Sequence, residues 1–388
     1  MKPLRCVLVT RRFWPLVGGA EVVMANLGAE FHQRDISCQI LTAQWQANWP
    51  TEFVHREVPV VRLRNPKQRI WGTFRYLSSL ARWLKDHADQ IDIVYVSMLK
   101  HDAYMATKIC RQQGIPVVLR AEGGGDTGDC HWQTTARFGL SIRRRCKTAT
   151  AVIAPSQAVA EELLAAGYPT DNLHLIPNGV ALPAKPAENS QQLARQALAE
   201  ANQDLVAAPE EPVVVYTGRL DRNKGLYDLV KAWPEVTKRW PRCHLWLVGE
   251  GPDRDRLFQQ IKDLDLQGQV VLPGVFDDVE EVLRAANLFI LPSYFEGLSI
   301  SLMEAMAHQV PVIASNIPGN NDIIQSGVNG CLVPAGNVSA ISQAIQDALA
   351  NPDQLTRWAT AAQQTIQNNY SLASMVNAHL KLFEQLVT

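Results

Sequence analysis

The feature that most constrains the fold is a regular alternation of short β-branched runs with longer helical patterns. In the first half of the chain, helical spacing appears near 20–33, 72–88 and 102–113, and apolar runs that predict strands lie at 6–10, 37–43, 91–97, 115–120, 151–156 and 173–179. Strands separated by helices of about 10–15 residues are typical of βαβ units on a parallel sheet. Ligands of such sheets bind beyond the carboxyl ends of the strands.

The pattern stops near residue 180 and restarts at residue 213. Strands are predicted at 213–218, 243–251, 269–275, 287–293, 310–315 and 330–334, and the tail from 352 to 388 is helical throughout. Residues 180–212 are rich in Ala, Gln, Glu and Pro, which predicts a linker with a surface helix. A chain of 388 residues is therefore expected to hold two α/β domains of the same type, which face each other across a cleft.

Composition and charge describe a globular chain with a basic first half. Hydrophobic residues make up 47% and charged residues 19% of the sequence. Residues 1–177 contain 22 Lys and Arg against 15 Asp and Glu, whereas the rest contains 15 against 23. This asymmetry indicates either an anionic partner for the first half, such as nucleic acid or an acidic membrane surface, or ordinary charge scatter between two domains.

The cysteines and the apolar runs bear on the compartment. The seven cysteines are scattered and never spaced as C-x-x-C, which argues against a disulfide framework and against a zinc site. The apolar run at the N-terminus is too short for a secretory signal, and no stretch approaches the roughly 18 apolar residues of a membrane span. We therefore expect a cytoplasmic protein.

Two glycine-containing loops resemble anion sites. In "YTGRLDRNKG" (216–225), Arg219 follows a predicted strand and Lys224 opens the next helix, so cations and helix N–H groups come together, although a solvated basic loop is the alternative. Gly18 and Gly19 lie between the first strand and a helix, where glycine lets backbone approach a phosphate. The G-x-G-x-x-G fingerprint is missing there, which disfavours a nicotinamide dehydrogenase.

The stretch "LPSYFEGLSISLMEAMA" (291–307) places Glu296 and Glu304 eight positions apart, the second among apolar residues. A carboxylate in apolar surroundings costs several kcal/mol unless it is paired or hydrogen-bonded. Residues 301–304 fit the S-x-x-E capping box, in which Glu304 would bond back to the helix start. If the helix begins near Gly297 instead, Glu304 lies too deep to cap, and the N–H groups of Gly297, Leu298 and Ser299 are available to a ligand.

These elements together, with "LVGEG" and "VPVIASNIPGNNDII", resemble the GT-B glycosyltransferases of the retaining GT4 family. The resemblance covers nearly the whole chain and is strongest from 213 to 334. It implies two Rossmann-like doubly wound α/β domains, one at 1–177 joined by the C-terminal helix at about 370–388, and one at 178–369 that includes the linker 180–212. It also implies a retaining, metal-independent hexosyltransferase that moves a sugar from a nucleotide-diphospho-sugar to a glycan or lipid-linked acceptor in polysaccharide or glycolipid biosynthesis.

The resemblance assigns roles to individual residues. By similarity, Arg219 and Lys224 neutralise the donor diphosphate, and Gly18 and Gly19 close over the phosphates. Glu296 binds the donor sugar and Glu304 binds the ribose. The backbone of Val275 and Phe276 holds the base. UDP is expected ahead of GDP or ADP as the nucleotide. No cofactor or metal is expected, and the D-x-D matches at 253–255 and 263–265 are interpreted as solvated surface.

The first half departs from the family pattern. A histidine that many members carry at the end of the strand corresponding to 91–97 is replaced by Ser97, with His101 either a displaced substitute or a surface residue. A family T-x-H-G motif after the next strand is replaced by "LRAEGGGDTGD", where Glu122 falls near the histidine's place. Arg120 and Glu122 are therefore expected to shape the acceptor side, unless this segment is only a flexible loop.

Residues 64–87 and 137–147 mix Arg and Lys with aromatic and apolar residues, among them Trp71, Phe74, Tyr76 and Trp83. Such segments either lie on an anionic membrane surface, at the inner face of the membrane here, or pack on their own sheet with basic outer faces. No nucleic-acid partner is expected. Two other functions stay open, namely a nucleotide-sugar epimerase of the same fold and a non-catalytic nucleotide-sugar-binding protein.

Overall fold

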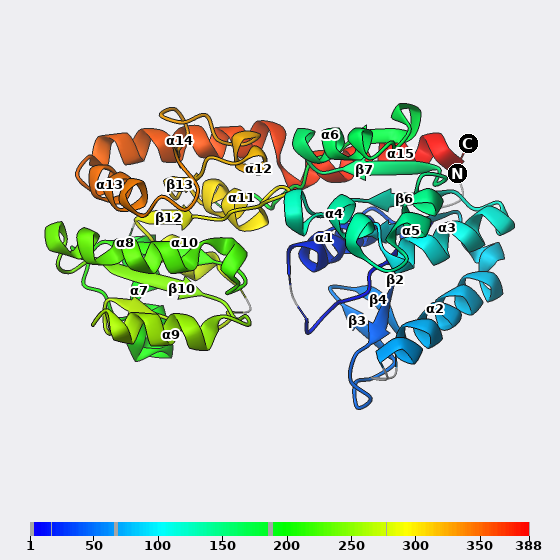
Figure 1. The fold of residues 1–388 in the computed structure, drawn as a ribbon, viewed down its shortest axis with the longest axis horizontal. Helices are drawn as coiled ribbons and strands as arrows, with labels where there is room; N and C mark the ends of the chain where they lie inside the picture. Colours follow the sequence, from blue (N-terminus) through cyan, green and yellow to red (C-terminus); the bar gives the residue numbers. More distant parts are fainter. Residues whose placement is uncertain (1–3, 17, 66–68, 185–188, 277, 388) are drawn as a thin grey trace. The chain divides into compact units, whose positions relative to one another are not determined.

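The computed structural model describes residues 4–16, 18–65, 69–184, 189–276 and 278–387, with only the backbone described at 69–71. The chain divides into two compact units (Figure 1). The first combines Met1–Asn178 with Leu372–Thr388, and the second is Gly179–Ser371. Each unit is an α/β structure in which most neighbouring strands run parallel.

The first unit is built on an eight-stranded sheet in the order β3-β4-β2-β1-β5-β6-β7-β8. All neighbouring strands run parallel except β3 and β4, which are antiparallel. The strands are β1 (Arg5–Val9), β2 (Ser37–Gln44), β3 (Glu52–His55), β4 (Val58–Arg64), β5 (Ile93–Ser97), β6 (Val117–Arg120), β7 (Ala151–Ala154) and β8 (Leu173–Leu175). β5, β6 and β7 are buried along their whole length, as expected for strands covered on both faces.

Helices cover both faces of this sheet. Val94 and Val96 of β5 belong to an apolar cluster shared with α2, α3 and α5, whereas the Tyr95 ring lies 6.0 Å from the ring of Phe383 in α15. Side chains alternate along a strand, so α15 and α1, joined by the Phe31–Phe383 ring pair, cover the opposite face. The helices are α1 (Gly19–Gln33), α2 (Arg69–Asp86), α3 (His101–Gln113), α4 (Asp129–Thr135), α5 (Gly139–Cys146), α6 (Gln157–Ala165) and α15 (Leu372–Val387), with 3-10 turns at Ala88–Gln90, Gly125–Thr127 and Thr170–Asn172.

The β3–β4 hairpin is a feature that the sequence patterns did not predict. Arg56 and Glu57 connect its strands and both have positive φ, 49° and 64°. Consecutive residues with positive φ suit a tight hairpin turn, but Asn and Gly are the usual residues there. Arg-Glu gives no such signal in the sequence. The strands β3 and β4 were therefore missing from the strands expected between residues 43 and 91.

The second unit is built on a six-stranded sheet in the order β11-β10-β9-β12-β13-β14, in which all neighbours run parallel. The strands are β9 (Val213–Thr217), β10 (His244–Val248), β11 (Val270–Val271), β12 (Leu288–Leu291), β13 (Val312–Ser315) and β14 (Cys331–Val333). From β9 the chain moves outward to β10 and β11, then returns to β12 on the other side of β9 and moves outward again. Right-handed crossovers therefore place the helix after β9 and the helix after β12 on opposite faces.

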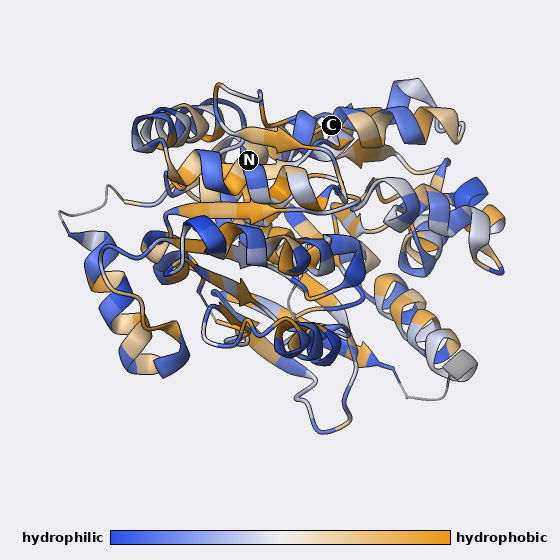
Figure 2. Cartoon of the chain, turned by 60° about the vertical axis from the view of Figure 1, so that its left-hand side comes forward, coloured by the Kyte–Doolittle hydropathy of each residue, from blue (hydrophilic) through white to orange (hydrophobic). Residues whose placement is uncertain are grey.

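The helices of the second unit are amphipathic. In α8, buried side chains recur at Leu226, Leu229, Val230, Trp233 and Val236, the spacing of a helix with one face on a sheet. Figure 2 shows that the strands are hydrophobic along most of their length, whereas the helices contain both hydrophilic and hydrophobic residues. The helices are α7 (Ser190–Ala201), α8 (Leu226–Arg239), α9 (Arg254–Asp263), α10 (Glu280–Ala285), α11 (Ile300–Ala307), α12 (Pro318–Asn321), α13 (Val338–Leu349) and α14 (Pro352–Asn369), with 3-10 turns at Gln203–Leu205 and Arg222–Lys224.

The segment expected to be a linker is partly built into the second unit. Arg195 of α7 is buried, and its guanidinium donates hydrogen bonds to the backbone oxygens of Ala285, Ala208, Pro209 and Glu211 and to the side chain of Asn287. α7 therefore packs against the helix that leads into β12, and the expectation of a surface helix was only partly correct.

The two basic segments proposed for a membrane surface differ in the structure. In α2, Tyr76, Leu80 and Leu84 are buried in the core, which leaves Phe74 as an exposed apolar side chain, while residues 66–68 and the side chain of Trp71 lie outside the described residues. In the other segment, Phe138 and Leu140 are 60% and 66% exposed. No helix in the described part of the chain is both long and apolar enough to cross a bilayer.

Candidate functional site

The strand order of the second unit reverses between β9 and β12, so the loops that follow these neighbouring strands lie side by side. This reversal is the position at which open α/β sheets bind ligands. The loop after β9 carries Arg219 and Lys224, and the loop after β12 carries Glu296. Residues 72 positions apart in sequence are thus brought to one edge.

Lys224 and Glu296 form the centre of this edge. The Lys224 Nζ donates to Glu296 Oε1 at 2.6 Å, and Ser293 Oγ donates to the same oxygen at 2.7 Å. The Glu296 side chain is only 9% exposed, and that of Lys224 is 27% exposed. The cation and the hydroxyl donor together fix the orientation of this carboxylate.

The backbone around Lys224 holds the two loops together. Gly225 has a φ of 67°, and a Cβ at this position would lie 2.0 Å from the carbonyl oxygen of Pro292, which follows β12. Next to it, the N–H of Tyr294 donates to the carbonyl of Asn223 at 2.8 Å. Only glycine fits so close an approach, so Gly225 positions Lys224 against the Glu296 loop.

The start of α11 differs from both alternatives drawn from the sequence. The helix begins at Ile300, and Ser299 is its N-cap, whose Oγ accepts the Leu302 N–H at 3.4 Å. Gly297 and Leu298 therefore lie before the helix, and the expectation of a helix start near Gly297 was wrong. The capping box at 301–304 was wrong too, because Ser301 is already inside the helix and Glu304 is its fifth residue.

Glu304 instead lies half-buried, without a hydrogen bond or ion pair to its side chain from any described residue. Burial, and secondly the nearby carboxylate of Asp278, raise the pKa of Glu304 to about 7. Asp278 belongs to the segment that follows β11, so this segment lies near α11. A carboxylate that lacks a protein partner in a site of this kind is available to a hydroxyl of a ligand.

The other residues expected at the donor side lie in loops of the same sheet. Arg219 is exposed, and no described residue pairs with its side chain. Val275 is 63% exposed and Phe276 packs against the core, in the segment after β11. That segment is tied to the end of β10, because the Gly249 N–H donates to the Gly274 oxygen at 2.7 Å.

The interpretation of the 253–255 D-x-D match as solvated surface was wrong for Asp253. This residue is 7% exposed, and its Oδ2 accepts the Arg222 N–H at 2.6 Å. Asp253 therefore ties the start of α9 to the turn that carries Lys224. Asp255, Asp263 and Asp265 are exposed.

A pocket of about 310 Å³ occupies the corresponding position in the first unit, where the strand order reverses between β1 and β5. Ser97 and His101, two of the residues expected on the acceptor side, line this pocket. The His101 ring is 5.2 Å from the ring of Trp132, and burial, followed by the charges of Arg11 and Lys100, lowers the pKa of His101. His101 is therefore part of a pocket wall rather than a surface residue.

The pocket also contains residues that the sequence patterns did not single out, namely Arg11, Arg12, Lys100, Trp45, Asp102 and Trp132. Arg11 and Arg12 directly follow the predicted strand at 6–10, and Lys100 lies three residues after the predicted strand at 91–97. Because ligands were expected beyond those strand ends, the cations at positions 11, 12 and 100 could have been found by the rule that was applied to Arg219. The two tryptophans arrive from other segments and gave no local signal.

A buried ion pair between Arg120 and Glu122 lies next to the pocket residue Ser97. Arg120 is fully buried, its guanidinium lies 2.5 Å from Glu122 Oε1, and it also donates to Asn178. The Ser97 Oγ donates to the same Glu122 oxygen at 2.9 Å. Arg120 is therefore connected to the pocket residue Ser97 through Glu122.

Gly18 and Gly19 lie at the start of α1, as the N-cap and the first helical residue. A Cβ at Gly18 would lie 2.6 Å from the Glu21 Oε2, and Glu21 is itself part of the pocket wall. A larger residue at position 18 would therefore require the Glu21 carboxylate to shift.

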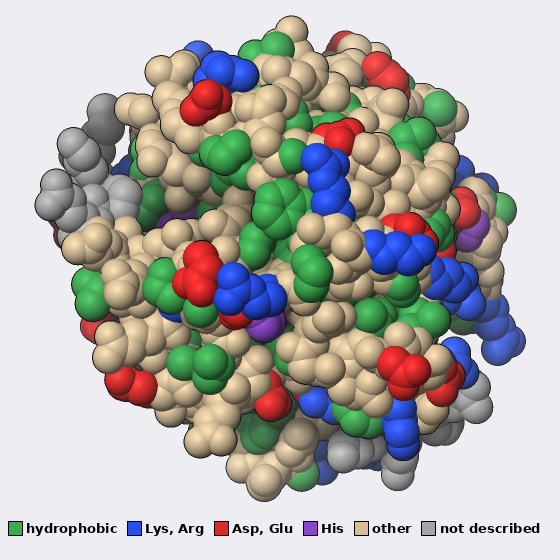
Figure 3. All heavy atoms as spheres, turned by 90° about the vertical axis from the view of Figure 1, so that its left-hand side faces the viewer, with side chains coloured by type: hydrophobic (Ala, Val, Ile, Leu, Met, Phe, Trp, Pro, Cys, Tyr) green, Lys and Arg blue, Asp and Glu red, His purple; other side chains and the backbone are tan. Residues whose placement is uncertain are grey.

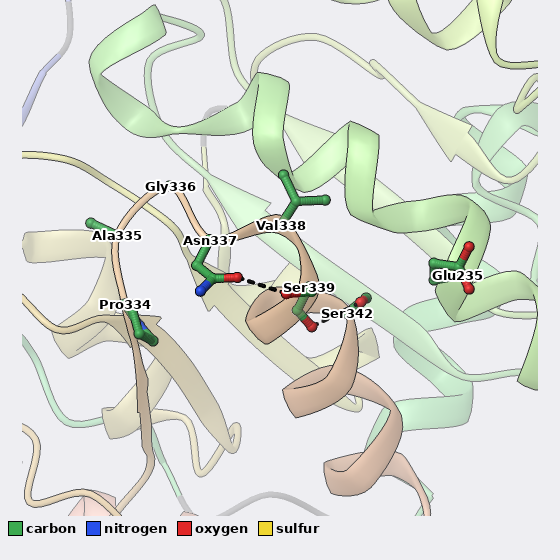
Figure 4. A pocket seen from close by; sticks show the side chains of 8 residues that line it. All are labelled: Glu235, Pro334, Ala335, Gly336, Asn337, Val338, Ser339 and Ser342. Atoms are coloured by element: carbon green, nitrogen blue, oxygen red, sulfur yellow. Dashed lines mark hydrogen bonds between the residues drawn. The ribbon is translucent and has the colours of Figure 1, made fainter.

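A further hollow of about 650 Å³ lies in the second unit between the start of α13 and α8 (Figure 4). Its lining contains one charged side chain, Glu235, and the backbone turn at Pro334–Asn337, where Asn337 accepts a hydrogen bond from Ser339. On the face of the molecule seen in Figure 3, basic and acidic side chains are interspersed among uncharged ones. Neither feature brings together groups with an evident chemical task.

Two family matches divide the chain as the structure does. Residues 17–182 match Glycosyltransferase Family 4, and residues 199–365 match Glycosyl transferases group 1. Among curated relatives, the lipopolysaccharide core biosynthesis glycosyltransferase LpsE of Rhizobium meliloti is 31% identical over 173 residues, which is 45% of this chain and 50% of the relative. The matched region thus spans about half the length of that relative.

Solved structures show the same fold over the whole chain. Sucrose-phosphate synthase from Thermosynechococcus elongatus superimposes with a TM-score of 0.84 at 22% identity and covers 99% of both chains. Anabaena HepE in complex with UDP-glucose superimposes with a TM-score of 0.80 at 20% identity and covers 98% of this chain and 100% of that one. The expected GT-B fold with two Rossmann-like domains is confirmed, and the chain belongs to the GT-B glycosyltransferases of the GT4 type.

Proposed function

We propose that this protein moves a hexose, with retention of configuration and without a metal, from a nucleotide-diphospho-sugar to a hydroxyl of a glycan or lipid-linked acceptor. The observation that carries the proposal is the Lys224–Glu296 pair at the strand reversal of the second sheet. A cation beside an oriented carboxylate matches the two parts of such a donor, because the diphosphate is anionic and the sugar offers hydroxyl donors.

The proposed reaction needs no nucleophile from the protein. The bond between the anomeric carbon and the diphosphate oxygen breaks, and its electron pair leaves with the nucleoside diphosphate. The acceptor oxygen forms the new bond on the same face, and its proton passes to the departing phosphate oxygen. Lys224 and Arg219 stabilise the negative charge that grows on the leaving group.

The other residues of the site bind the donor in this proposal. Glu296, oriented by Ser293, accepts hydrogen bonds from the sugar, and Glu304 accepts them from the ribose. The segments at Gly297–Ser299, at Val275 and Phe276, and at Gly18 and Gly19 supply backbone contacts to the phosphates and the base. Since α11 begins at Ile300, N–H groups of its first turn, rather than those of Gly297 and Leu298, carry the helix dipole toward the donor.

The first experiment identifies the donor. Thermal-shift measurements with UDP-, GDP- and ADP-glucose at equal concentration should show the largest rise in melting temperature with UDP-glucose, the compound named in the HepE complex. The same samples are then assayed for release of the nucleoside diphosphate in the presence of candidate acceptors. No shift and no release with any nucleotide sugar would overturn the proposal.

Incubation of the donor without an acceptor separates transfer from the alternatives. An epimerase converts the nucleotide sugar by itself, so a second nucleotide sugar would appear. A binding protein leaves the donor unchanged with and without acceptors. Transfer predicts an intact donor in the absence of acceptor, apart from slow hydrolysis, and consumption when acceptor is added.

We also propose peripheral binding to the inner face of the membrane through the segment around α5. Phe138 and Leu140 are exposed there beside Arg137 and Arg144, which are exposed as well. Apolar side chains flanked by arginines suit an anionic bilayer surface. The double variant Phe138→Ser and Leu140→Ser should bind vesicles with anionic lipid severalfold more weakly, measured by sedimentation, and unchanged binding would contradict this part of the proposal.

A further inference from the structure

We propose that Asp253 is a positioning residue for Lys224, because its carboxylate fixes the turn Arg222–Lys224 and this turn sets where the lysine side chain starts. The proposal has two parts. The first, that Asp253 holds the turn, stands on contacts within the second unit alone. The second, that the turn places Lys224 for work on a diphosphate, rests on the proposed function.

Asp253 is the N-cap of α9, but its carboxylate does not cap that helix. An aspartate at an N-cap usually accepts an N–H from the first turn of its own helix, which stabilises the helix. Here no side-chain cap bond is present, and Oδ2 accepts the Arg222 N–H at 2.6 Å instead. The carboxylate is therefore used on the loop that follows β9 rather than on its own helix.

The surroundings of the carboxylate favour a fixed contact. The Asp253 side chain is only 9% exposed, so water competes little for the bond to the Arg222 N–H. The other oxygen, Oδ1, lies 3.8 Å from Nη1 of Arg256, whose side chain is 80% exposed. Because so exposed an ion pair contributes little, the short bond to Arg222 is the stronger of these two contacts.

The backbones of the two loops stay in contact as far as Asp253. Beyond the ends of β9 and β10, the Leu220 N–H donates to the Glu250 oxygen at 3.0 Å, and the Asp253 N–H donates to the Leu220 oxygen at 3.1 Å. A Cβ at Gly251 would lie 2.1 Å from that Leu220 oxygen, so glycine is needed for this approach. The Asp253 carboxylate then binds the loop two residues further on, at Arg222.

Each N–H group of the turn Arg222–Lys224 is hydrogen-bonded. The Asn223 N–H donates to Asp221 Oδ1 at 3.0 Å, and the Lys224 N–H donates to the Asp221 carbonyl oxygen at 2.9 Å. Asp221 thus holds the second and third residues, and Asp253 holds the first. Without Asp253, the start of the turn loses its link to the neighbouring loop.

The Lys224 side chain leads from this turn to Glu296. Its Nζ lies 2.6 Å from Glu296 Oε1. The flexible four-carbon stem of a lysine can keep such a pair from several backbone positions. A shift of the turn would therefore move the ammonium relative to a bound diphosphate without breaking the ion pair. In the proposed reaction this displacement lowers kcat, because the lysine charge acts on the leaving group.

The first measurement needs no substrate. Arg222 is exposed, so protection of its amide proton depends on the bond to Asp253. Its hydrogen exchange, followed by NMR, should become about tenfold faster in Asp253→Ala. The control is Asp255→Ala, which removes an exposed aspartate two residues further on and should leave this rate unchanged. An unchanged rate in Asp253→Ala would overturn the first part.

Steady-state kinetics of sugar transfer test the second part. Asp253→Ala should lower kcat about tenfold to a hundredfold with little change in KM. Asp253→Asn keeps an oxygen that accepts the Arg222 N–H, so its kcat should stay within about threefold of the unmodified protein. Asp255→Ala should leave both constants unchanged. A change in KM alone, or equal losses of kcat in the Ala and Asn variants, would contradict the positioning role.

A double variant shows whether Asp253 acts through Lys224. When Asp253→Ala is added to Lys224→Ala, kcat should fall no further, because the side chain to be positioned is already missing. A further tenfold loss would overturn the second part. Melting temperatures verify folding, and Asp253→Ser, which keeps a hydroxyl to cap α9 but is shorter than aspartate, replaces the alanine variant if that variant is unfolded.

The two measurements separate this proposal from the proposed function. If the unmodified protein transfers no sugar, the proposed function fails and the second part fails with it. The exchange of the Arg222 amide still decides whether Asp253 holds the turn. If the protein transfers sugar and Asp253→Ala has normal kcat, the proposed function stands and the positioning role is overturned.

Discussion

In both sheets the strand order reverses between two neighbouring strands, and the loops that follow these strands form what we call the edge of the sheet. The residues in these loops differ between the two units. At the edge of the second sheet, Lys224, Glu296 and Ser293 are already joined, and Gly225 holds their loops in backbone contact. At the edge of the first sheet, a pocket with two tryptophans contains Lys100, for which the described residues provide no ion pair. The strand order fixes where a site lies, and the loop residues decide what it can bind.

The largest expected effect is on the stability of the first unit and concerns the buried pair of Arg120 and Glu122. Arg120→Met leaves Glu122 without its cation, so the free energy of unfolding should fall by about 3–5 kcal/mol, measured by denaturant titration. Arg5→Met is the control, because its pair with Asp92 is partly exposed and its loss should matter far less. Equal losses would mean that the Arg120 pair is better solvated than its burial indicates.

The next effect tests the second edge directly. Lys224→Ala should lower kcat for sugar transfer by about 10²–10³, the effect of removing one group that stabilises a leaving charge. The control Lys238→Ala removes a lysine that pairs with Glu235 on the exposed side of α8. Near-normal turnover of the Lys224 variant, with an unchanged melting temperature, would refute the diphosphate role.

Two glycines, one in each unit, test how much the close contact between the loops of the second unit contributes to stability. Gly225 and Gly114 have φ angles of 67° and 70°, but a Cβ at Gly225 would meet Pro292 O at 2.0 Å, whereas one at Gly114 meets nothing within 4 Å. Both alanine variants bear the left-handed backbone strain, about 1 kcal/mol. Gly225→Ala should lose a further 1–3 kcal/mol or so in denaturant titration, because the loops must separate. A matched loss in both variants would show that the loop contact is adaptable.

The smallest predicted effect is a pH dependence of donor binding at the second edge. The pKa of Glu304, raised to about 7, means that the carboxylate is mostly protonated at pH 6 and mostly ionised at pH 8. Charge-assisted hydrogen bonds to the ribose should then strengthen donor binding up to about tenfold as pH rises through 7. Glu304→Gln should bind donor weakly at every pH, whereas the exposed Glu281→Gln should keep the pH profile, both measured by calorimetry. A flat profile in the unmodified protein would contradict the ribose role.

Much of the fold could be predicted because its signals are local. The strands at 37–43 and 213–218 were placed within a residue of β2 and β9, since a β-branched run that must be buried on both faces leaves a continuous apolar stretch. The hairpin at β3 and β4 was missed because Arg56 and Glu57 occupy turn positions that glycine or asparagine usually marks. The start of α11 was placed wrongly, because Gly297, Ser299 and Ser301 are all acceptable cap residues in sequence, and only the backbone dihedrals select Ser299.

The α/β class, the repeated domain type and the loops in which charged residues could contact a ligand followed from the sequence alone. Periodicity and strand ends depend only on residues that are close together in the sequence. Tertiary structure decided which of those charges are paired. It joined Lys224 to Glu296, paired the buried Arg120 with Glu122, and placed Lys100 near the ring of Trp132 and the buried carboxylates of Asp102 and Asp129. Pairing depends on contacts between residues tens of positions apart, and the free energy of a charge depends on its neighbours and its solvation, which no local pattern records.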